Sequence, residues 1–351
     1  MSRVGILTFL HNDNYGSALQ AYALQRVIRE LGHECVHLDY APDRNEKIRS
    51  LLRSGNSPKL ILDGLRKRSV RAGQEGARTK SAAIPAFYAR RMRLSERCRN
   101  TEELRKAAGE YDTLVCGSDQ IWNPVWLNPA YFLTFAPEGT RKVAYAPSLG
   151  ISTLPPAGKI RKIRKWTEGF DAVSVRETEG ADLLEKMAGI RADVMPDPVC
   201  LLSREEWAEI AAPAPAGEKY LLCYFIGTNR SYREKVRQIS RETGLRVLEI
   251  PVTAEGYGEG FERLEGLGPE EFLGAVFGAT CFCTDSFHGL VFGTLAGVRT
   301  EAIRRYREDD PESKNSRVDQ FLRVIKEKGM DELREEGREW LRRAMCKTHK
   351  A

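Results

Sequence analysis

The 351-residue sequence lacks several features that would assign it to a common class of protein. It contains no run of about 18 apolar residues, so we expect no membrane-spanning helix. Its start, Met1-Ser2-Arg3 before a short strand-like run, does not have the layout of a signal peptide. No Cys or His spacing typical of a metal site occurs, and we expect neither a metal nor a cofactor.

Cysteines are few and scattered. Of the eight, only Cys281 and Cys283 lie close together, and in a strand they would face the same side. This pattern favours buried free thiols over metal ligands. We therefore expect a reduced, cytoplasmic protein; the basic segment described next would place it at the inner face of the membrane.

Charge is unevenly distributed along the chain. The net charge is +6, yet residues 44–106 alone carry 18 Lys and Arg against 6 Asp and Glu. Such a segment can meet anionic lipid, nucleic acid or a polyanionic glycan, or it can be a solvated helical excursion with locally paired arginines. It has no aromatic-interleaved recognition motif, so we expect no nucleic acid partner and favour peripheral contact with an anionic membrane surface.

The first 40 residues follow a βαβ pattern. Arg3–Leu10 forms an apolar run typical of a buried strand, and the polar loop 11–16 follows it. Ser17-x-x-Gln20 has the form of a capping box, and Cys35–Asp39 is the next expected strand. The loop is neither a Rossmann glycine fingerprint nor a Walker loop. It nevertheless meets a helix N-terminus, which suits an anion such as a phosphate or a carboxylate.

Residues 41–106 break the α/β rhythm, and we interpret them as a basic, partly helical, peripheral insertion. The rhythm resumes with a strand at 111–116 that ends in Gly117-Ser118-Asp119-Gln120. Trp122 and Trp126 follow closely. This mixture suits a sugar, which offers hydroxyls at its edge and C–H bonds on its face; alternatively the tryptophans pack in the core.

The strand at 172–175 delivers Arg176 and Glu177 at its carboxyl end. Arg176 there could make a bidentate contact with a phosphate or a carboxylate, or form a salt bridge with Glu177. The Pro- and Ala-rich stretch 211–217 is interpreted as a connection to a second α/β series. Two helices are expected after Ser316, and the last could cross back to the first domain.

The second series ends in the sequence's most informative motif, Thr284-Asp285-Ser286-Phe287-His288-Gly289. A strand, tight turn and helix here would place His288 at the carboxyl edge of a sheet, where open α/β folds bind ligands.

Several segments together resemble the polysaccharide pyruvyl transferase family. They occur in one order along residues 1–325, leaving out the insertion: 14–25, 117–123, 145–150, 174–177, 197–198, 268–273, 284–289 and 315–317.

This resemblance implies two Rossmann-like domains facing across a cleft, similar to the GT-B glycosyltransferases. The boundaries would be 1–200 and 218–325, with a helical tail at 326–351. It also implies transfer of a pyruvyl group from phosphoenolpyruvate to a sugar of a cell-surface polysaccharide or its lipid-linked precursor, forming a ketal.

The resemblance assigns catalysis to His288 and Arg176. Substrate binding is expected at residues of the matched motifs: Asn14, Tyr15, Gly16, Ser118, Asp119, Gln120, Trp122, Asp285, Ser286 and Arg317. In the family an arginine commonly lies two residues before the histidine; here that residue is Ser286. Arg317, Arg304 or Arg305 could supply the cation instead.

Two other functions fit the same sequence. The first is a GT-B-type glycosyltransferase that uses a nucleotide sugar, and the second is a non-catalytic glycan-binding protein. Nucleotide binding in the second domain would indicate the first, and acceptor binding without turnover would indicate the second.

Overall fold

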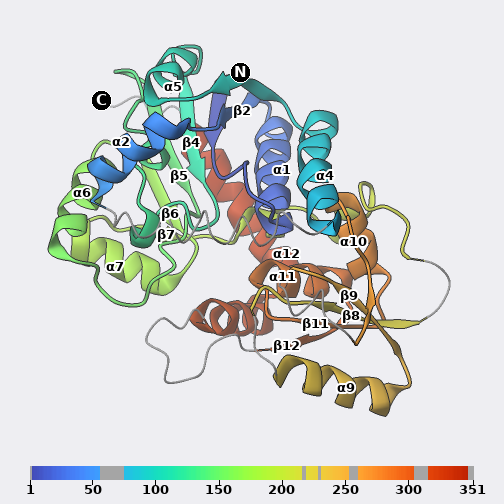
Figure 1. Cartoon of the computed structure of the whole chain (residues 1–351). Coiled ribbons are helices and arrows are strands. Elements are labelled where there is room, and N and C mark those ends of the chain that lie inside the picture. The colour runs from blue at the N-terminus through green and yellow to red at the C-terminus, as the bar shows by residue number, and fades with distance from the viewer. Residues whose placement is uncertain are drawn as a thin grey trace.

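The computed structural model of the chain describes residues 2–55, 75–215, 219–227, 231–252, 260–303 and 315–346. Within these ranges the strands form two separate sheets, one in each half of the molecule (Figure 1). Every strand pairing in both sheets is parallel, so helices make the crossovers between strands. The predicted α/β fold with two Rossmann-like halves is confirmed.

The first sheet has seven strands in the order β3-β2-β1-β4-β5-β6-β7. Its strands are β1 (Arg3–Leu7), β2 (Glu34–Tyr40), β3 (Leu94–Cys98), β4 (Thr113–Gly117), β5 (Arg141–Tyr145), β6 (Ala172–Val175) and β7 (Asp193–Val194). All five residues of the central strand β4 are buried, as expected of a strand covered by helices on both faces.

The second sheet has five strands in the order β10-β9-β8-β11-β12. Its strands are β8 (Tyr220–Tyr224), β9 (Arg246–Ile250), β10 (Glu262–Arg263), β11 (Cys281–Thr284) and β12 (Arg299–Ala302). Cys281 and Cys283 lie in β11 as buried free thiols, which confirms that prediction.

Helices of the first half follow its strands: α1 (Tyr15–Glu30), α2 (Arg44–Ser54), α4 (Glu75–Arg91), α5 (Thr101–Ala108), α6 (Ala157–Thr167), α7 (Thr178–Ala188) and α8 (Arg204–Ala208). Three 3-10 helices accompany them: η1 (Pro124–Trp126), η2 (Pro129–Phe132) and η3 (Pro198–Leu201). The second half contains α9 (Ser231–Thr243), α10 (Pro269–Phe277) and α11 (Phe287–Ala296).

The prediction of a capping box at Ser17 is wrong. The N-cap of α1 is Asn14, three residues earlier, and the helix begins at Tyr15. The Asn14 side chain accepts a hydrogen bond from the Gly16 N–H at 2.9 Å. Ser17 and Gln20 are thereby left inside the helix, with side chains available for contacts near the site.

The basic stretch 41–106 is less peripheral than predicted. Strand β3 from this stretch pairs with β2 at the edge of the first sheet, and α5 packs against it. Helix α4 lies between the halves, where Arg90 and Arg91 both pair with Glu270 of α10. Residues 56–74 of the predicted insertion lie outside the described residues.

The last helix, α12 (Asn315–Met345), joins the two halves. It breaks at Gly329, whose φ of 79° and ψ of 171° are not helical, so it behaves as the two predicted helices. Its last turns reach the first sheet, where Trp340 donates to Asp193 at 2.7 Å and Arg141 donates to the Ala344 carbonyl at 2.9 Å. The predicted return of the terminal helix to the first half is confirmed.

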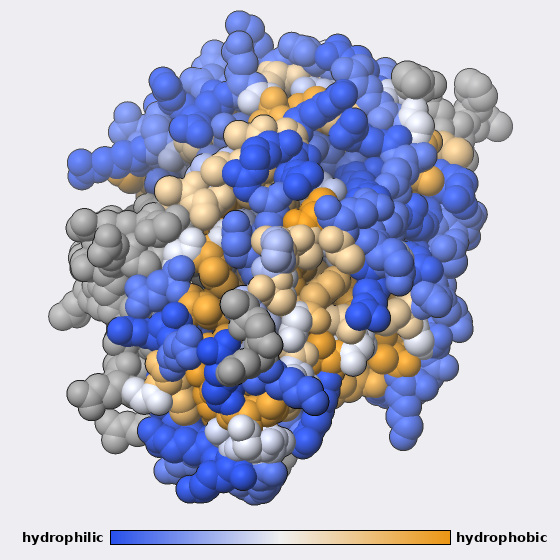
Figure 2. All heavy atoms as spheres, turned by 90° about the vertical axis from the view of Figure 1, so that its right-hand side faces the viewer, coloured by the Kyte–Doolittle hydropathy of each residue, from blue (hydrophilic) through white to orange (hydrophobic). Residues whose placement is uncertain are grey.

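Seen from the side of α4 and α10, most of the surface is hydrophilic, and apolar side chains gather across its middle (Figure 2). None of the helices in the described ranges is long and apolar enough to cross a bilayer.

Candidate functional site

The strand orders of the two sheets locate the candidate site. In each sheet the order reverses between the first strand and the fourth, which puts a switch point between β1 and β4 and another between β8 and β11. Loops after such strands form the ligand crevice of open α/β folds. Gly16, Ser118 and His288 all come from these loops or from the helix turns that follow them.

His288 lies in the first turn of α11, pressed against the first turn of α1. A Cβ atom added to Gly16 would lie 2.1 Å from His288 Nδ1, so only glycine lets the ring approach this closely. Gly16 and His288, which are 272 positions apart in the sequence, are therefore in direct contact. Here the N-termini of two helices converge, and both favour negative charge.

Ser286 fixes the helix that carries His288. Its hydroxyl accepts a hydrogen bond from the Gly289 N–H at 3.2 Å, and its own N–H donates to Thr284 Oγ1 at 3.1 Å. With 3% exposure, Ser286 is the N-cap of α11. The residue found in place of the family's arginine thus has a structural task of its own.

Asp197 connects the two predicted catalytic residues. Its Oδ2 lies 2.6 Å from Arg176 Nη1, 3.3 Å from Ser118 Oγ and 3.4 Å from His288 Nε2. The carboxylate is 1% exposed. Burial alone would raise the pKa of Asp197, but His288 and Arg176 outweigh it and hold that pKa well below its ordinary value.

Arg176 is buried among acids and an aromatic ring. It donates to Glu177 Oε1 at 2.9 Å, and its guanidinium lies 4.5 Å from the centre of the Phe287 ring. Burial would lower the pKa of Arg176, whereas Glu177 and Asp197 raise it, so the side chain is charged. Its buried Nη2 makes no hydrogen bond within the described residues, and neither does His288 Nε2. Buried donors without partners are what a bound polar ligand would satisfy.

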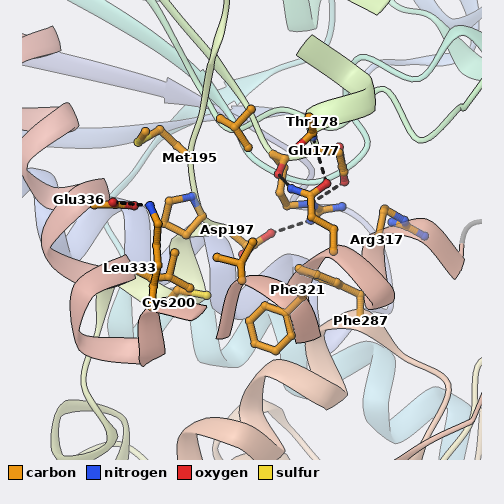
Figure 3. Close-up of a pocket in the computed structure, with 16 residues that line it drawn as sticks. Glu177, Thr178, Met195, Asp197, Cys200, Phe287, Arg317, Phe321, Leu333 and Glu336 are labelled. Atoms are coloured by element: carbon orange, nitrogen blue, oxygen red, sulfur yellow. Dashed lines mark hydrogen bonds and ion pairs between the residues drawn. The ribbon is translucent and has the colours of Figure 1, made fainter. Parts of the chain in front are cut away.

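A pocket of about 180 Å³ opens beside Arg176 and Asp197. Figure 3 shows Glu177, Thr178 and Arg317 at one end of it, Met195, Leu333 and Glu336 at the other, and Phe287 and Phe321 between them. Arg317 therefore brings a second guanidinium to the polar end. Arg304 and Arg305, the other predicted cation sources, lie outside the described residues.

The remaining polar candidates form a network at the end of β4. Asp119 accepts hydrogen bonds from the Ser17 hydroxyl and from the Gln120 N–H, and both Asp119 and Gln120 are half-buried. Ser118 is fully buried; its N–H donates to Gln20 Oε1 and its hydroxyl to the Ala146 carbonyl. Ser118 thus shapes the site from beneath, while Asp119 and Gln120 remain accessible to a ligand.

Three residues predicted to contact the substrate are buried and contact other parts of the protein instead. Trp122 is 1% exposed, stacked on Phe132 with ring centres 4.9 Å apart, and donates to the Tyr131 carbonyl. It is a core residue, so its prediction as a sugar platform is wrong. A buried ring offers no face to a sugar.

Tyr15 and Asp285 are also engaged by the protein. Tyr15 is 1% exposed, stacks on Phe272 at 4.6 Å and donates its hydroxyl to the Leu267 carbonyl. Asp285 is 7% exposed and accepts hydrogen bonds from the N–H groups of Ile226 and Gly227 after β8. Tyr15 therefore links the two halves, and Asp285 holds the loop after β8.

Asp197 was not predicted as a site residue, although it belongs to a recognised motif. Its Asp-Pro sequence is equally typical of a helix cap, and its side chain does cap η3 through the Val199 N–H. His11, in the loop before α1, also pairs with a carboxylate: its Nε2 is 2.5 Å from Asp39 Oδ1.

Comparison with known proteins places the chain in one family. A family model described as polysaccharide pyruvyl transferase matches residues 14–304. No curated protein matches the chain.

Solved structures are similar only in fold. UDP-GlcNAc 2-epimerase from Neisseria meningitidis, bound to UDP-GlcNAc, is 8% identical with a TM-score of 0.51, over 99% of this chain and 100% of that one. A putative UDP-N-acetylglucosamine 2-epimerase from Listeria monocytogenes is 11% identical with a TM-score of 0.49, over 95% and 90%. E. coli heptosyltransferase WaaC is 12% identical with a TM-score of 0.41, over 92% and 99%. At these identities the first likeness shows the two-domain GT-B-like fold and nothing about substrates.

Proposed function

Because the chain belongs to the polysaccharide pyruvyl transferase family, we propose that it transfers a pyruvyl group from phosphoenolpyruvate to a sugar, forming a cyclic ketal. The acceptor would be a sugar of a cell-surface polysaccharide or of its lipid-linked precursor. The observation that carries the proposal is the position of His288, where two helix N-termini converge and the carboxylate of Asp197 is 3.4 Å from Nε2.

The reaction needs an acid first. A proton added to the methylene carbon of phosphoenolpyruvate makes the neighbouring carbon electrophilic. One sugar hydroxyl then adds to that carbon, phosphate leaves, and a second hydroxyl closes the ring. The two hydroxyl protons balance the proton taken up by the methylene carbon and the proton carried away by phosphate.

We assign the proton donor to His288 Nε2. Asp197 stabilises the charged imidazolium, and the low exposure of both residues keeps the proton from bulk water. Unlike the Ser-His-Asp triad, in which the carboxylate holds the ring nitrogen opposite the reacting one, Asp197 here faces the reacting nitrogen itself.

Arg176 would bind the anionic donor through Nη2, the guanidinium nitrogen that makes no hydrogen bond within the described residues. Its other two nitrogens are held by Glu177 and Asp197, which fix the direction of Nη2. Because these acids neutralise much of its charge, we propose that Arg317 supplies further positive charge at the same polar end of the pocket.

The acceptor would lie on the wall formed by Asn14, Asp119 and Gln120. Asp119 and Gln120 are half-buried and carry carboxylate and amide groups suited to sugar hydroxyls. Asn14 contributes less directly, since its Oδ1 already caps α1.

Phosphate release from phosphoenolpyruvate, measured with a panel of acceptor sugars, tests the proposal. His288→Ala should lower kcat by at least about 100-fold, because a positioned acid contributes roughly 10²–10⁴-fold. The matched control is His33→Ala, since His33 precedes β2 and so lies at the opposite edge of the sheet. Equal rates for wild type and His288→Ala would remove His288 from the mechanism.

A thermal-shift series distinguishes the donor classes. Phosphoenolpyruvate should raise Tm and the Arg176→Lys variant should lose that shift, because lysine cannot reproduce the fixed fork. A shift with nucleotide sugars and none with phosphoenolpyruvate would favour a glycosyltransferase instead.

A further inference from the structure

Helix α2 turns polar side chains toward the protein and apolar side chains toward solvent, the reverse of the usual arrangement in a surface helix. It buries Glu46, Ser50 and Ser54, which repeat at a spacing of four. The opposite face presents Ile48 and Leu52 to solvent, 44% and 77% exposed. An apolar stripe turned outward marks a surface that meets another apolar phase.

The apolar stripe has positive charge on its own helix. Four of the eleven residues of α2 are basic and one, Glu46, is acidic. Glu46 is 2% exposed; its Oε1 accepts a hydrogen bond from Thr101 and lies 3.6 Å from Arg53 Nη1, so it offsets one of the four cations and leaves three.

Helix α6 adds a second basic surface beside α2, and Figure 1 shows the two helices next to each other. Five of its eleven residues are basic and none is acidic. A cavity of about 480 Å³ lies between the end of α2 and α6, lined by Ser54, Gly55, Pro156, Gly158, Lys159, Arg161, Lys162 and Lys165. Among these lining residues there is no carboxylate. Burial, and then the like charge of Lys162, lowers the pKa of Lys159.

Exposed apolar side chains concentrate around these two helices. Across the described ranges seven large apolar side chains are strongly exposed, and five belong to α2, to η1 or to the segment just before α6: Ile48, Leu52, Val125, Trp126 and Leu154. A hydrogen bond from Lys159 Nζ to the Pro124 carbonyl ties η1 to α6, and α2 and α6 both pack on η2. The basic cavity and the apolar side chains therefore belong to one neighbourhood, which we call the α2–α6 face.

We propose that the α2–α6 face docks on an anionic lipid bilayer, with lipid phosphates at the basic cavity and Ile48 and Leu52 in the acyl boundary. A soluble polyanion would account for the lysines but would leave the apolar stripe without a partner. Basic residues beside exposed aliphatic and tryptophan side chains are the composition of interfacial membrane contacts. The bilayer accounts for both.

The docking surface also lies toward the reaction centre. Helix α6 follows β5, so it begins at the carboxyl edge of the first sheet, the edge that carries Ser118 and Arg176. Docking would bring this edge near the bilayer and thereby favours a lipid-linked acceptor. This point rests on the proposed function, whereas membrane binding itself does not.

Co-sedimentation of the full chain with vesicles tests the proposal. Wild type should bind vesicles of phosphatidylcholine with phosphatidylglycerol and should not bind phosphatidylcholine alone. Each cation near an anionic surface contributes about 1 kcal/mol, so Lys162→Ala/Lys165→Ala should weaken the partition coefficient roughly 25-fold. The matched control, Lys235→Ala/Arg241→Ala, removes two exposed charges from α9 in the other half and should leave binding unchanged.

A variant that removes the apolar side chains distinguishes binding to a bilayer from binding to a soluble polyanion. Ile48→Ser/Leu52→Ser keeps every charge and should weaken vesicle binding by roughly tenfold or more. Unchanged binding by this variant, or equal losses for the α6 and α9 pairs, would overturn the proposal. So would failure of the wild type to bind anionic vesicles. Phosphate release with a soluble acceptor, measured on the same samples, shows separately whether the proposed chemistry holds.

Discussion

Gly16→Ala is the substitution for which the structure makes the sharpest prediction. Gly16 lies in the first turn of α1 and does not have a positive φ, so alanine meets no backbone strain there. Helix propensity alone would make the variant more stable, by up to ~1 kcal/mol. The new methyl group, however, would lie 2.1 Å from Nδ1 and 2.3 Å from Cγ of His288. The imidazole or the helix must therefore shift by about 1 Å, a misplacement that can cost 10²-fold in rate.

Two magnitudes follow for this variant. Overpacking costs about 1–3 kcal/mol, which the gain in helix propensity partly offsets, so the free energy of unfolding should fall by about 1–2 kcal/mol. The value of kcat/KM for phosphate release should fall roughly 100-fold. Urea unfolding and the phosphate assay measure the two effects on the same preparation.

A double-mutant cycle with His288→Ala identifies the cause. His288→Ala removes the two atoms closest to the new methyl group, Nδ1 and Cγ, and leaves Cβ at 2.7 Å. In this background, Gly16→Ala should therefore lower the free energy of unfolding by about 1 kcal/mol less than it does in the wild type. The control is Gly180→Ala in α7, whose added methyl would meet its nearest atom at 3.5 Å. Full activity in Gly16→Ala, or identical costs in both backgrounds, would refute the inferred contact.

Other variants test separate parts of the site. Asp197→Asn should lower the free energy of unfolding by about 3 kcal/mol at pH 7, because it leaves the Arg176 charge buried with less compensation. The pKa of Asp197 is lower in the folded state, so its stabilisation is complete above about pH 4 and is lost as pH falls further. The gap between wild type and Asp197→Asn in urea unfolding should therefore stay constant down to about pH 4 and narrow as the pH falls below it, and a gap that stays constant below pH 4 would contradict the ion pair. Ser286→Ala should cost about 1 kcal/mol in Tm-derived stability through loss of the α11 cap, and no change would show that Ser286 does not cap the helix. Trp122→Ala should destabilise the fold by about 3–5 kcal/mol, and reduced acceptor affinity without this loss would return Trp122 to the site.

Much of the fold could be predicted because parallel strands covered on both faces are continuous apolar runs. The strand at 172–175 was predicted to the residue. Strand β3 was missed because its sequence, Leu94-Ser95-Glu96-Arg97-Cys98, is largely polar, and only its last residue is buried at this edge of the sheet. Its identity depends on pairing with β2, which no local pattern contains.

The sequence motifs were enough to choose residues of the candidate site, but not to predict which of them contact one another. His288 and Arg176 could be chosen because their residue types suit the chemistry. The sequence could not show that Asp197 joins them, since the three residues meet only after both halves fold. The prediction for Trp122 was wrong for a related reason. A tryptophan suits a sugar, but here its ring packs on Phe132 and Phe170 and is buried.

Contacts link the two halves on both sides of the candidate site. Tyr15 stacks on Phe272, and Arg90 and Arg91 pair with Glu270, so α1 and α4 are fastened to α10 (Figure 1). Parting the halves there would expose an aromatic stack and strip two arginines of their partner. On the side of α7, the Arg176 guanidinium lies 4.5 Å from the centre of the Phe287 ring, and the Thr178 N–H donates to Gln320 of α12 at 3.0 Å. Any movement that widens the pocket would therefore have to break contacts on both sides: the aromatic stack and the arginine pairs at α10, and the Phe287 and Gln320 contacts near α7.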